Sequence, residues 1–90
     1  MKTVQLQYTK TSIKDLKKLE KKTSLRILKK IEENAHMKNP LERAKVLTGL
    51  LENTYRYRVG DYRAIFQYDE SGKIIILTIM TIKHRKEVYK

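Results

Sequence analysis

Hydrophobic positions repeat every second residue at the start of the chain and through its second half. Residues 4–8 alternate apolar and polar side chains, which predicts a short strand with one apolar face. Residues 55–59 and 62–68 show the same period and predict two further strands. Nearly every position from residue 74 to residue 80 is apolar, so the segment 73–83 predicts a central strand covered on both faces.

A helical period replaces this alternation between residues 12 and 35. The first helix is expected to take Ser12 as its N-cap, with Asp15 close to the unpaired amide groups of the first turn. The pattern restarts at residues 21–24, and a second amphipathic helix should end before Pro40. The apolar positions that define this helical hairpin are Ile13, Leu16, Leu19, Leu25, Leu28, Ile31 and Ala35.

The remaining segments complete the predicted order of elements. Residues 40–53 indicate either a short helical turn or a packed loop, which Gly49 would end. Residues 69–72 predict a turn, and the tail from residue 84 a final helical turn. Residues 1–90 should therefore form one α+β domain, with an N-terminal strand, a two-helix hairpin and an antiparallel three-strand meander (β-α-α-β-β-β). The helices should lie on one face of the sheet.

Composition narrows the chemistry that this domain can perform. A chain of 90 residues suits one domain, and it contains no cysteine. That excludes disulfides, zinc–thiolate sites, iron–sulfur clusters and thiol nucleophiles. The first ten residues lack the apolar stretch of a secretory signal, and the longest apolar run is too short to cross a bilayer. A cytoplasmic location is expected.

The charge balance indicates a polyanionic partner. Lys and Arg number 21 against 10 Asp and Glu, which gives a formal net charge of +11. Such self-repulsion does not help folding, so nucleic acid, an acidic protein or an anionic membrane should bind; the alternative is a merely soluble basic surface. A membrane is the weakest candidate because no exposed Trp or Phe lies opposite the helix lysines. The candidate RNA contacts on the helical hairpin are Lys14, Lys17, Lys18, Lys21, Lys22 and Lys29.

The segment YRYRVGDYR combines strand alternation with three arginines. Gly60 and Asp61 fit a two-residue type II′ turn, which pairs Arg58 with Arg63 and puts Arg56 on the same face. Like charges directly opposite each other destabilise a strand pair, and the arginine fork fits phosphate oxygens, so an anion should complete this face. Solvated arginines, or arginines paired with carboxylates from elsewhere in the chain, are the alternative. The other face, expected to pack on the helices, carries Tyr55, Tyr57, Val59, Tyr62, Ala64, Phe66 and Tyr68.

The C-terminal tail supplies further candidates for the same site. Lys83 ends the last predicted strand, and Arg85 and Tyr89 are four residues apart, so one helical turn would put them on one side. Histidine ordinarily changes charge near neutral pH, which makes His84 a candidate proton acceptor. His36, at the end of the second helix, is expected to be structural.

The arginine hairpin, the apolar strand after it and the ending IKHRKEVYK resemble the RelE/ParE toxin superfamily of toxin–antitoxin systems. The resemblance covers nearly the whole chain. It implies a RelE-like toxin that cuts mRNA in the ribosomal A site, in contact with rRNA and without a metal or other cofactor. The ribose 2′-hydroxyl attacks the adjacent phosphorus and leaves a cyclic phosphate. It also implies a cognate acidic antitoxin, operator DNA binding only through the antitoxin complex, and no membrane partner.

The resemblance also assigns roles to the basic residues. Arg58 and Arg63 would grip the scissile phosphate, and Arg56 would contact phosphate or orient the 2′-hydroxyl. Lys83 and Arg85 would contribute charge at the leaving oxygen, and Tyr89 would stack on a base or transfer a proton.

One departure from the RelE pattern leaves the general base open. Some members carry lysines at the positions of Arg56 and Arg58, and an arginine hardly gives up its proton. His84 and Tyr89 are the candidate bases. Two alternatives for function also stay open, a ParE-like inhibitor of DNA gyrase and a basic nucleic-acid-binding module without chemistry. The retained basic cluster favours the RelE type.

Overall fold

The computed structural model describes residues 2–47 and 52–88. Its strands form one sheet in the order β1-β5-β4-β3-β2, with β1 parallel to β5 and the other neighbours antiparallel. The predicted α+β class is confirmed, although the sheet is mixed rather than purely antiparallel. The elements are β1 (Thr3–Tyr8), α1 (Lys10–Lys17), α2 (Lys21–Ala35), β2 (Ala44–Val46), β3 (Thr54–Val59), β4 (Tyr62–Ser71), β5 (Ile74–His84) and α3 (Arg85–Val88).

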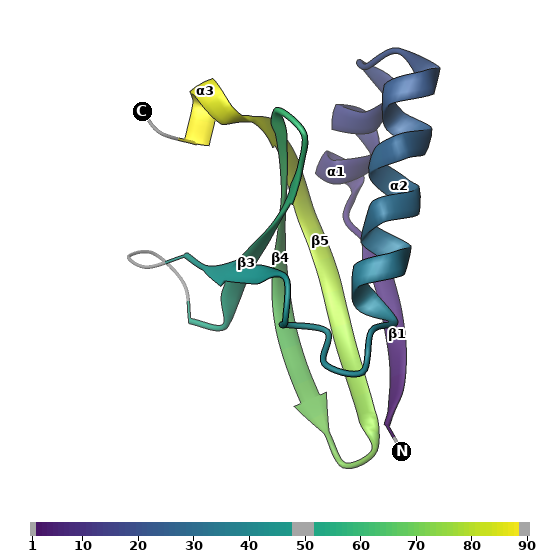
Figure 1. The fold of residues 1–90 in the computed structure, drawn as a ribbon, viewed down its shortest axis with the longest axis vertical. Coiled ribbons are helices and arrows are strands. Elements are labelled where there is room, and N and C mark those ends of the chain that lie inside the picture. Colours follow the sequence, from purple (N-terminus) through teal and green to yellow (C-terminus); the bar gives the residue numbers. More distant parts are fainter. Residues whose placement is uncertain (1, 48–51, 89–90) are drawn as a thin grey trace.

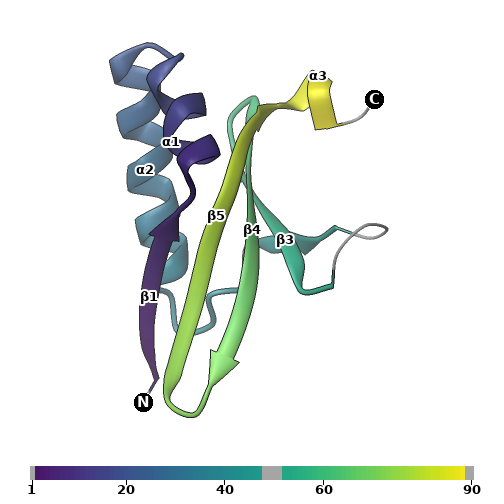
Figure 2. The same cartoon turned by 180° about the vertical axis from the view of Figure 1, so that it is seen from behind.

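Helices α1 and α2 stand together along β1 and cover one face of the sheet, as predicted (Figure 1). The short helix α3, which confirms the predicted C-terminal turn, projects away from them at the end of β5, and Figure 2 shows the same arrangement from behind. None of the helices in the described ranges is long and apolar enough to cross a membrane.

The core lies between α2 and the sheet. Ile27 and Ile31 of α2 are fully buried, and so are Tyr57 and Phe66, whose ring centroids are 4.4 Å apart. The Tyr57 hydroxyl donates a hydrogen bond to the carbonyl oxygen of Pro40 at 2.6 Å, so the one polar atom of this ring is satisfied inside the core. The predicted apolar face of β3 and β4 is confirmed. Its other members are Val59 and Ala64, which are buried, and Tyr55, Tyr62 and Tyr68, which pack on the core while partly exposed.

The predicted apolar stripe of α2 was wrong at its first position. Leu25 is 55% exposed, whereas Ile27, two residues later, is fully buried. The inner face of the helix comprises Ile27, Ile31, Asn34 and Ala35, which follow the spacing i, i+4, i+7, i+8. A stripe that begins at Leu25 faces partly away from the sheet. The prediction also left out Asn34, which is buried.

The start of α1 also differs from the prediction. Thr9, not Ser12, is the N-cap, and its side-chain oxygen accepts the amide of Ser12 at 3.1 Å. The Asp15 carboxylate does not serve the first turn of the helix. It accepts the Thr81 hydroxyl and, at 3.0 Å, the amide of Ile82, on the stretch of β5 that continues past the end of β1. A side chain of α1 thus satisfies a strand edge that would otherwise lack a partner.

Strand β5 is covered by helices on one face only. The inward residues Ile75, Leu77, Ile79 and Ile82 are at most 6% exposed. On the other face Ile74 is 41% exposed, and Ile76 and Met80 are half-buried. The prediction of two covered faces was therefore wrong. β5 is central in the sheet, between β1 and β4, but its second face is only partly shielded.

Residues 40–53 contain a strand that the hydrophobic pattern did not predict. A turn over residues 40–43 leads into β2, where Ala44 pairs with Tyr57 of β3. Three residues are too few to show a clear alternation, and the hydrogen bonds to β3 define this strand. Gly49, the expected end of the segment, lies outside the described residues.

The turn between β4 and β5 is shorter than predicted. Asp69 and Glu70 belong to β4, and the turn consists of Gly72, at φ +59°, and Lys73. The carboxylate of Glu70 contacts the Lys2 ammonium of the N-terminal segment and accepts the Tyr68 hydroxyl. These hydrogen bonds, with that from Lys2 the larger cause, hold the pKa of the Glu70 carboxyl below its ordinary value. Pairing with β5 therefore extends β4 through residues that composition assigned to a turn.

Replacing Asp15 by alanine should lower the free energy of unfolding by about 1–3 kcal/mol, because the Ile82 amide and the Thr81 hydroxyl lose their acceptor. Glu33→Ala is the matched control, since it removes the same charge from an exposed position of a chain that carries +11. Urea denaturation of both variants separates the loss of the hydrogen bonds to β5 from the change in net charge. Equal losses would show that net charge, not the hydrogen bonds to β5, accounts for the change.

Replacing Tyr57 by phenylalanine should give a stability difference that depends on pH. Burial raises the pKa of the Tyr57 phenol above its ordinary value of 10.0. The folded state then holds this proton more tightly than the unfolded chain, so the contribution of Tyr57 is complete below pH 10.0 and is lost as the pH rises further. At pH 7 Tyr57→Phe should be roughly 1 kcal/mol less stable, because the Pro40 carbonyl loses its donor. Denaturation at several pH values should show this gap narrowing above pH 10, and a constant gap would contradict the assignment.

Candidate functional site

A basic cavity lies on β2, β3 and β4, on the face of the sheet that the helices leave uncovered. Its volume is about 230 Å³. We call it the arginine cavity, and the residues that line it are Arg43, Lys45, Arg56, Arg58 and Arg63. Among the residues that the structure describes, no Asp or Glu lines it, so an anion placed there would meet positive charge from three strands.

The β3–β4 hairpin sets the positions of the three arginines in the centre of the cavity. Gly60 has φ +58°, as the first central position of a type II′ turn requires, and Val59 pairs with Tyr62. Arg58 therefore pairs with Arg63, and Arg56 with Ile65. The predicted register is confirmed at every pair from Tyr55 to Val59. The three arginines share one face because the aromatic residues between them occupy the other.

Arg63 is buried and is held in one direction within the cavity. Its side chain is 4% exposed, and Nη1 donates hydrogen bonds to the carbonyl oxygens of Gly60 at 3.1 Å and Tyr62 at 3.0 Å. No carboxylate of the described residues forms an ion pair with it. These two carbonyls fix the direction of the guanidinium, but they do not neutralise its charge, so a bound anion would gain a strong, preoriented partner.

The neighbouring strands extend the arginine pair into rows of basic residues. Lys45 of β2 pairs with Arg56, and Lys83 of β5 pairs with Arg63. Arg43 directly precedes β2. It lies opposite Arg58 if the register of β2 and β3 continues by one residue. Because directly paired residues in an antiparallel sheet point to the same face, all of these side chains share the face of the arginine cavity.

A β-bulge in β5 directs Lys83 to that face. Ile65 pairs with Thr81 but Phe66 pairs with Ile79, so Met80 is an extra residue on β5. Before the bulge, odd-numbered residues of β5 point to the core, whereas after it Ile82 does. Without the bulge Lys83 would point toward the helices, which is the kind of change in side-chain direction that bulges produce.

Of the tail residues predicted for the site, His84 and Arg85 are close to the hairpin but do not line the cavity. Arg85 is attached to the turn: its amide donates to the Asp61 carbonyl at 2.7 Å, and its Nε lies 3.7 Å from the Asp61 carboxylate. His84 pairs with Tyr62 and contacts that ring edge-on, at a centroid distance of 5.3 Å, so it lies on the opposite face from Lys83. Tyr89 lies outside the described residues.

The hydrogen bond to His84 bears on its predicted role as a base. Its Nδ1 accepts the backbone amide of Lys86 at 3.3 Å, so a neutral ring in this arrangement carries its proton on Nε2. While it accepts this bond, Nδ1 is not open to a proton from an RNA hydroxyl.

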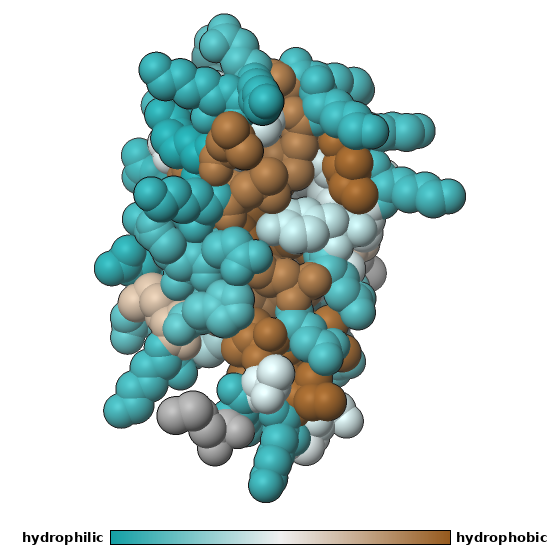
Figure 3. Space-filling model, turned by 90° about the vertical axis from the view of Figure 1, so that its right-hand side faces the viewer, coloured by the Kyte–Doolittle hydropathy of each residue, from teal (hydrophilic) through white to brown (hydrophobic). Residues whose placement is uncertain are grey.

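The six lysines predicted to contact RNA are all exposed on α1, α2 and the short connection between them. They lie on the helical side of the sheet, away from the arginine cavity, so the structure divides the predicted basic residues between two surfaces. Lys17 and Lys21 border an apolar groove of about 460 Å³ between the helices and β1. Figure 3 shows apolar side chains running as a stripe between hydrophilic ones on this side of the molecule.

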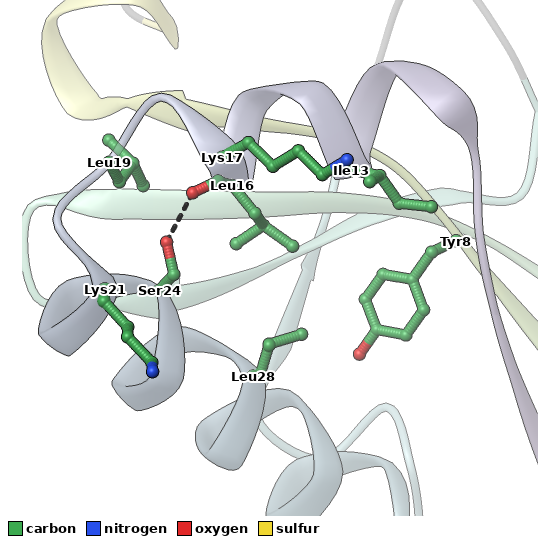
Figure 4. Close-up of a pocket in the computed structure, with 8 residues that line it drawn as sticks. All are labelled: Tyr8, Ile13, Leu16, Lys17, Leu19, Lys21, Ser24 and Leu28. Carbon is green, nitrogen blue, oxygen red and sulfur yellow. Dashed lines mark hydrogen bonds between the residues drawn. The ribbon is translucent and has the colours of Figure 1, made fainter.

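Figure 4 shows the groove in detail. Ile13, Leu16 and Leu28 point into it from the two helices, and Ser24 donates a hydrogen bond to the Leu16 carbonyl that joins the helices. Tyr8 closes one end, and burial, helped by the charge of Glu32, raises the pKa of its phenol to about 12. Apolar side chains thus lie inside the groove, and two lysines lie at its rim.

Arg43 and Lys45 are the site residues that the sequence analysis missed. They fall in the segment that was expected to be a helical turn or loop. The run Arg43-Ala44-Lys45-Val46 alternates basic and apolar residues, as the strand with Arg56 and Arg58 does. That alternation was the available signal for a strand with a basic face.

Inorganic phosphate should stabilise the protein through the arginine cavity. At a phosphate concentration of 100 times the dissociation constant, the free energy of unfolding should rise by about 2.7 kcal/mol. Arg63→Met should abolish this gain, and in phosphate-free buffer it should be as stable as the parent chain or about 1 kcal/mol more stable, because a buried, unneutralised cation is gone. Thermal unfolding with and without phosphate at constant ionic strength measures both effects, with Lys73→Ala as the control. An equal phosphate response in all three proteins would refute specific binding.

Comparison with known proteins places the chain in a family. The sequence profile of the ParE toxin of the type II toxin–antitoxin system parDE matches residues 6–89. The toxin–antitoxin complex RelBE2 of Mycobacterium tuberculosis contains a chain with 25% identity, over 94% of each chain, at a TM-score of 0.71. No curated protein matches.

Two archaeal structures are also similar. A chain of the RelE–RelB complex of Pyrococcus horikoshii OT3 is 27% identical, over 92% of this chain and 96% of that one, at a TM-score of 0.68. A chain of the RelB–RelE complex of Methanococcus jannaschii is 31% identical, over 92% of this chain and 94% of that one, at a TM-score of 0.54. The protein therefore belongs to the RelE/ParE superfamily of toxins of type II toxin–antitoxin systems.

Proposed function

We propose that this toxin is an endoribonuclease that cuts mRNA in the ribosomal A site of a prokaryotic cytoplasm and so inhibits translation. The observation that carries the proposal is the arginine cavity. It combines a buried arginine, held by two backbone carbonyls, with a second arginine directly opposite. Cleavage of a phosphodiester by its own ribose needs charge stabilisation and positioning more than a cofactor, and this cavity provides both.

The reaction assigned to the cavity is an internal transesterification. The ribose 2′-hydroxyl loses its proton to a base and attacks the adjacent phosphorus, the bond from phosphorus to the 5′-oxygen breaks, and that oxygen takes up a proton. Negative charge develops on the non-bridging oxygens, where Arg58 and Arg63 would donate hydrogen bonds. Because Arg63 is already oriented, little reorganisation is needed when this charge appears.

The remaining residues would act around that centre. Arg56 would contact the phosphate or orient the 2′-hydroxyl, and Lys83 and Arg85 would stabilise the leaving oxygen. Because His84 lies on the opposite face from Lys83 and its Nδ1 accepts the Lys86 amide, we favour Tyr89 as the base. The exposed lysines of the helical hairpin would contact rRNA, whose binding should therefore weaken with salt.

The partner proposed for the apolar groove is an amphipathic, acidic segment of a cognate antitoxin. The similar RelE chains occur in complexes with RelB proteins. The groove offers apolar side chains between Lys17 and Lys21, which complements such a segment in both hydrophobicity and charge. Operator DNA would be bound only through the toxin–antitoxin complex.

Inducible expression with primer extension on cellular mRNA tests the activity. The parent chain should stop growth and cut transcripts, and Arg63→Ala should cut about 10²- to 10³-fold more slowly, as when one donor to a developing oxyanion is removed. Arg58→Ala, at an exposed position, repeats the test without disturbing a buried residue, and Lys73→Ala should remain toxic.

Two outcomes would identify other functions. Intact transcripts together with altered plasmid supercoiling would indicate a gyrase inhibitor. RNA binding with neither toxicity nor cleavage would indicate a binding module without chemistry.

A further inference from the structure

The arginine cavity is larger than the space that one phosphate bound to Arg58 and Arg63 would fill. Its volume of about 230 Å³ is roughly fifteen times that of the smallest cavity that holds one water molecule. A single phosphate has five heavy atoms. The additional part of the cavity is lined by Arg43 and Lys45, both exposed and both contributed by or next to β2.

The geometry separates these two residues from Arg63. Strands β2 and β4 are second neighbours in the sheet, so they are about 10 Å apart. The guanidinium of Arg63 cannot swing toward β2 without giving up its hydrogen bonds to Gly60 and Tyr62. One phosphate bound to Arg63 therefore leaves Arg43 and Lys45 available for a different anionic group.

We propose that Arg43 and Lys45 form a second phosphate subsite, so that single-stranded RNA crosses the strands from β4 toward β2 instead of running along them. This inference rests on the proposed function, since it assigns the first phosphate to Arg58 and Arg63. The second phosphate is a neighbouring one in the same RNA backbone. Such a contact holds the register of the RNA without taking part in the chemistry, so Arg43 and Lys45 act as binding residues.

A competing explanation exists for charges on β2. It is an edge strand of the sheet, and exposed lysines or arginines on an edge keep it from pairing with other chains. That explanation predicts self-association when the charges are removed and no change in RNA binding. The second subsite predicts weaker RNA binding and no self-association.

The test uses 2′-O-methylated single-stranded RNA, which cannot be cut because it lacks the attacking hydroxyl. Oligonucleotides with one and with three internucleotide phosphates are titrated over a range of salt concentrations. The parent chain should show a steeper dependence of log K on log salt for the longer oligonucleotide, by about 0.7 for each additional phosphate contacted. Arg43→Ala/Lys45→Ala should bind the shorter oligonucleotide like the parent chain and lose about 0.7 of the slope for the longer one.

Lys38→Ala/Lys73→Ala is the control, because it removes the same charge from exposed positions that do not line the arginine cavity. It should keep both parent slopes. Equal slopes for all three proteins, or no binding of either oligonucleotide by the parent chain, would overturn the second subsite. The mRNA cleavage assay decides the activity separately. If mRNA is cleaved but the salt slopes are equal, only the second subsite is refuted. If the salt slope changes but mRNA is not cleaved, only the proposed activity is refuted.

Discussion

Arg58 and Arg63 face each other across the β3–β4 hairpin, and Arg63 is almost completely buried there. Both features oppose folding, since like charges repel across a strand pair and a desolvated cation costs several kcal/mol. The carbonyls of Gly60 and Tyr62 offset part of this cost without supplying negative charge. The folded chain thus keeps uncompensated positive charge at one place, which a bound anion would neutralise.

The opposite face of the same strands supplies the stability that tolerates this deficit. Tyr57 lies between Arg56 and Arg58 in β3 and is fully buried against Phe66. Burying an aromatic side chain of this size contributes roughly 1.5–3 kcal/mol, and Tyr57 adds a hydrogen bond to Pro40. Strand alternation therefore couples the core to the site: the register that places the aromatic rings inside also places the arginines together outside.

Sequence reasoning succeeded where local geometry determines the outcome. A two-residue turn at Gly60 and Asp61 fixes which residues pair, so the positions of Arg58 and Arg63 followed from the turn alone. It failed where long-range contacts decide. Asp15 bonds to β5 residues far along the chain, and β2 exists because β3 pairs with it. Arg43 and Lys45 were missed for that reason, although their alternation with Ala44 and Val46 was visible.

The bulge at Met80 connects the helical side of the protein with the arginine cavity. The hydroxyl of Thr9, at the start of α1, donates to the Met80 carbonyl at 2.7 Å, and Asp15 accepts the next two available groups of β5, from Thr81 and Ile82. These bonds hold the extra residue in place from the edge where β1 ends. Because the bulge decides which face Lys83 occupies, the cap of α1 and one carboxylate help to set the charge of a surface that they do not touch. A change at the first helix would therefore reach the basic face through β5, whose Lys83 pairs with Arg63.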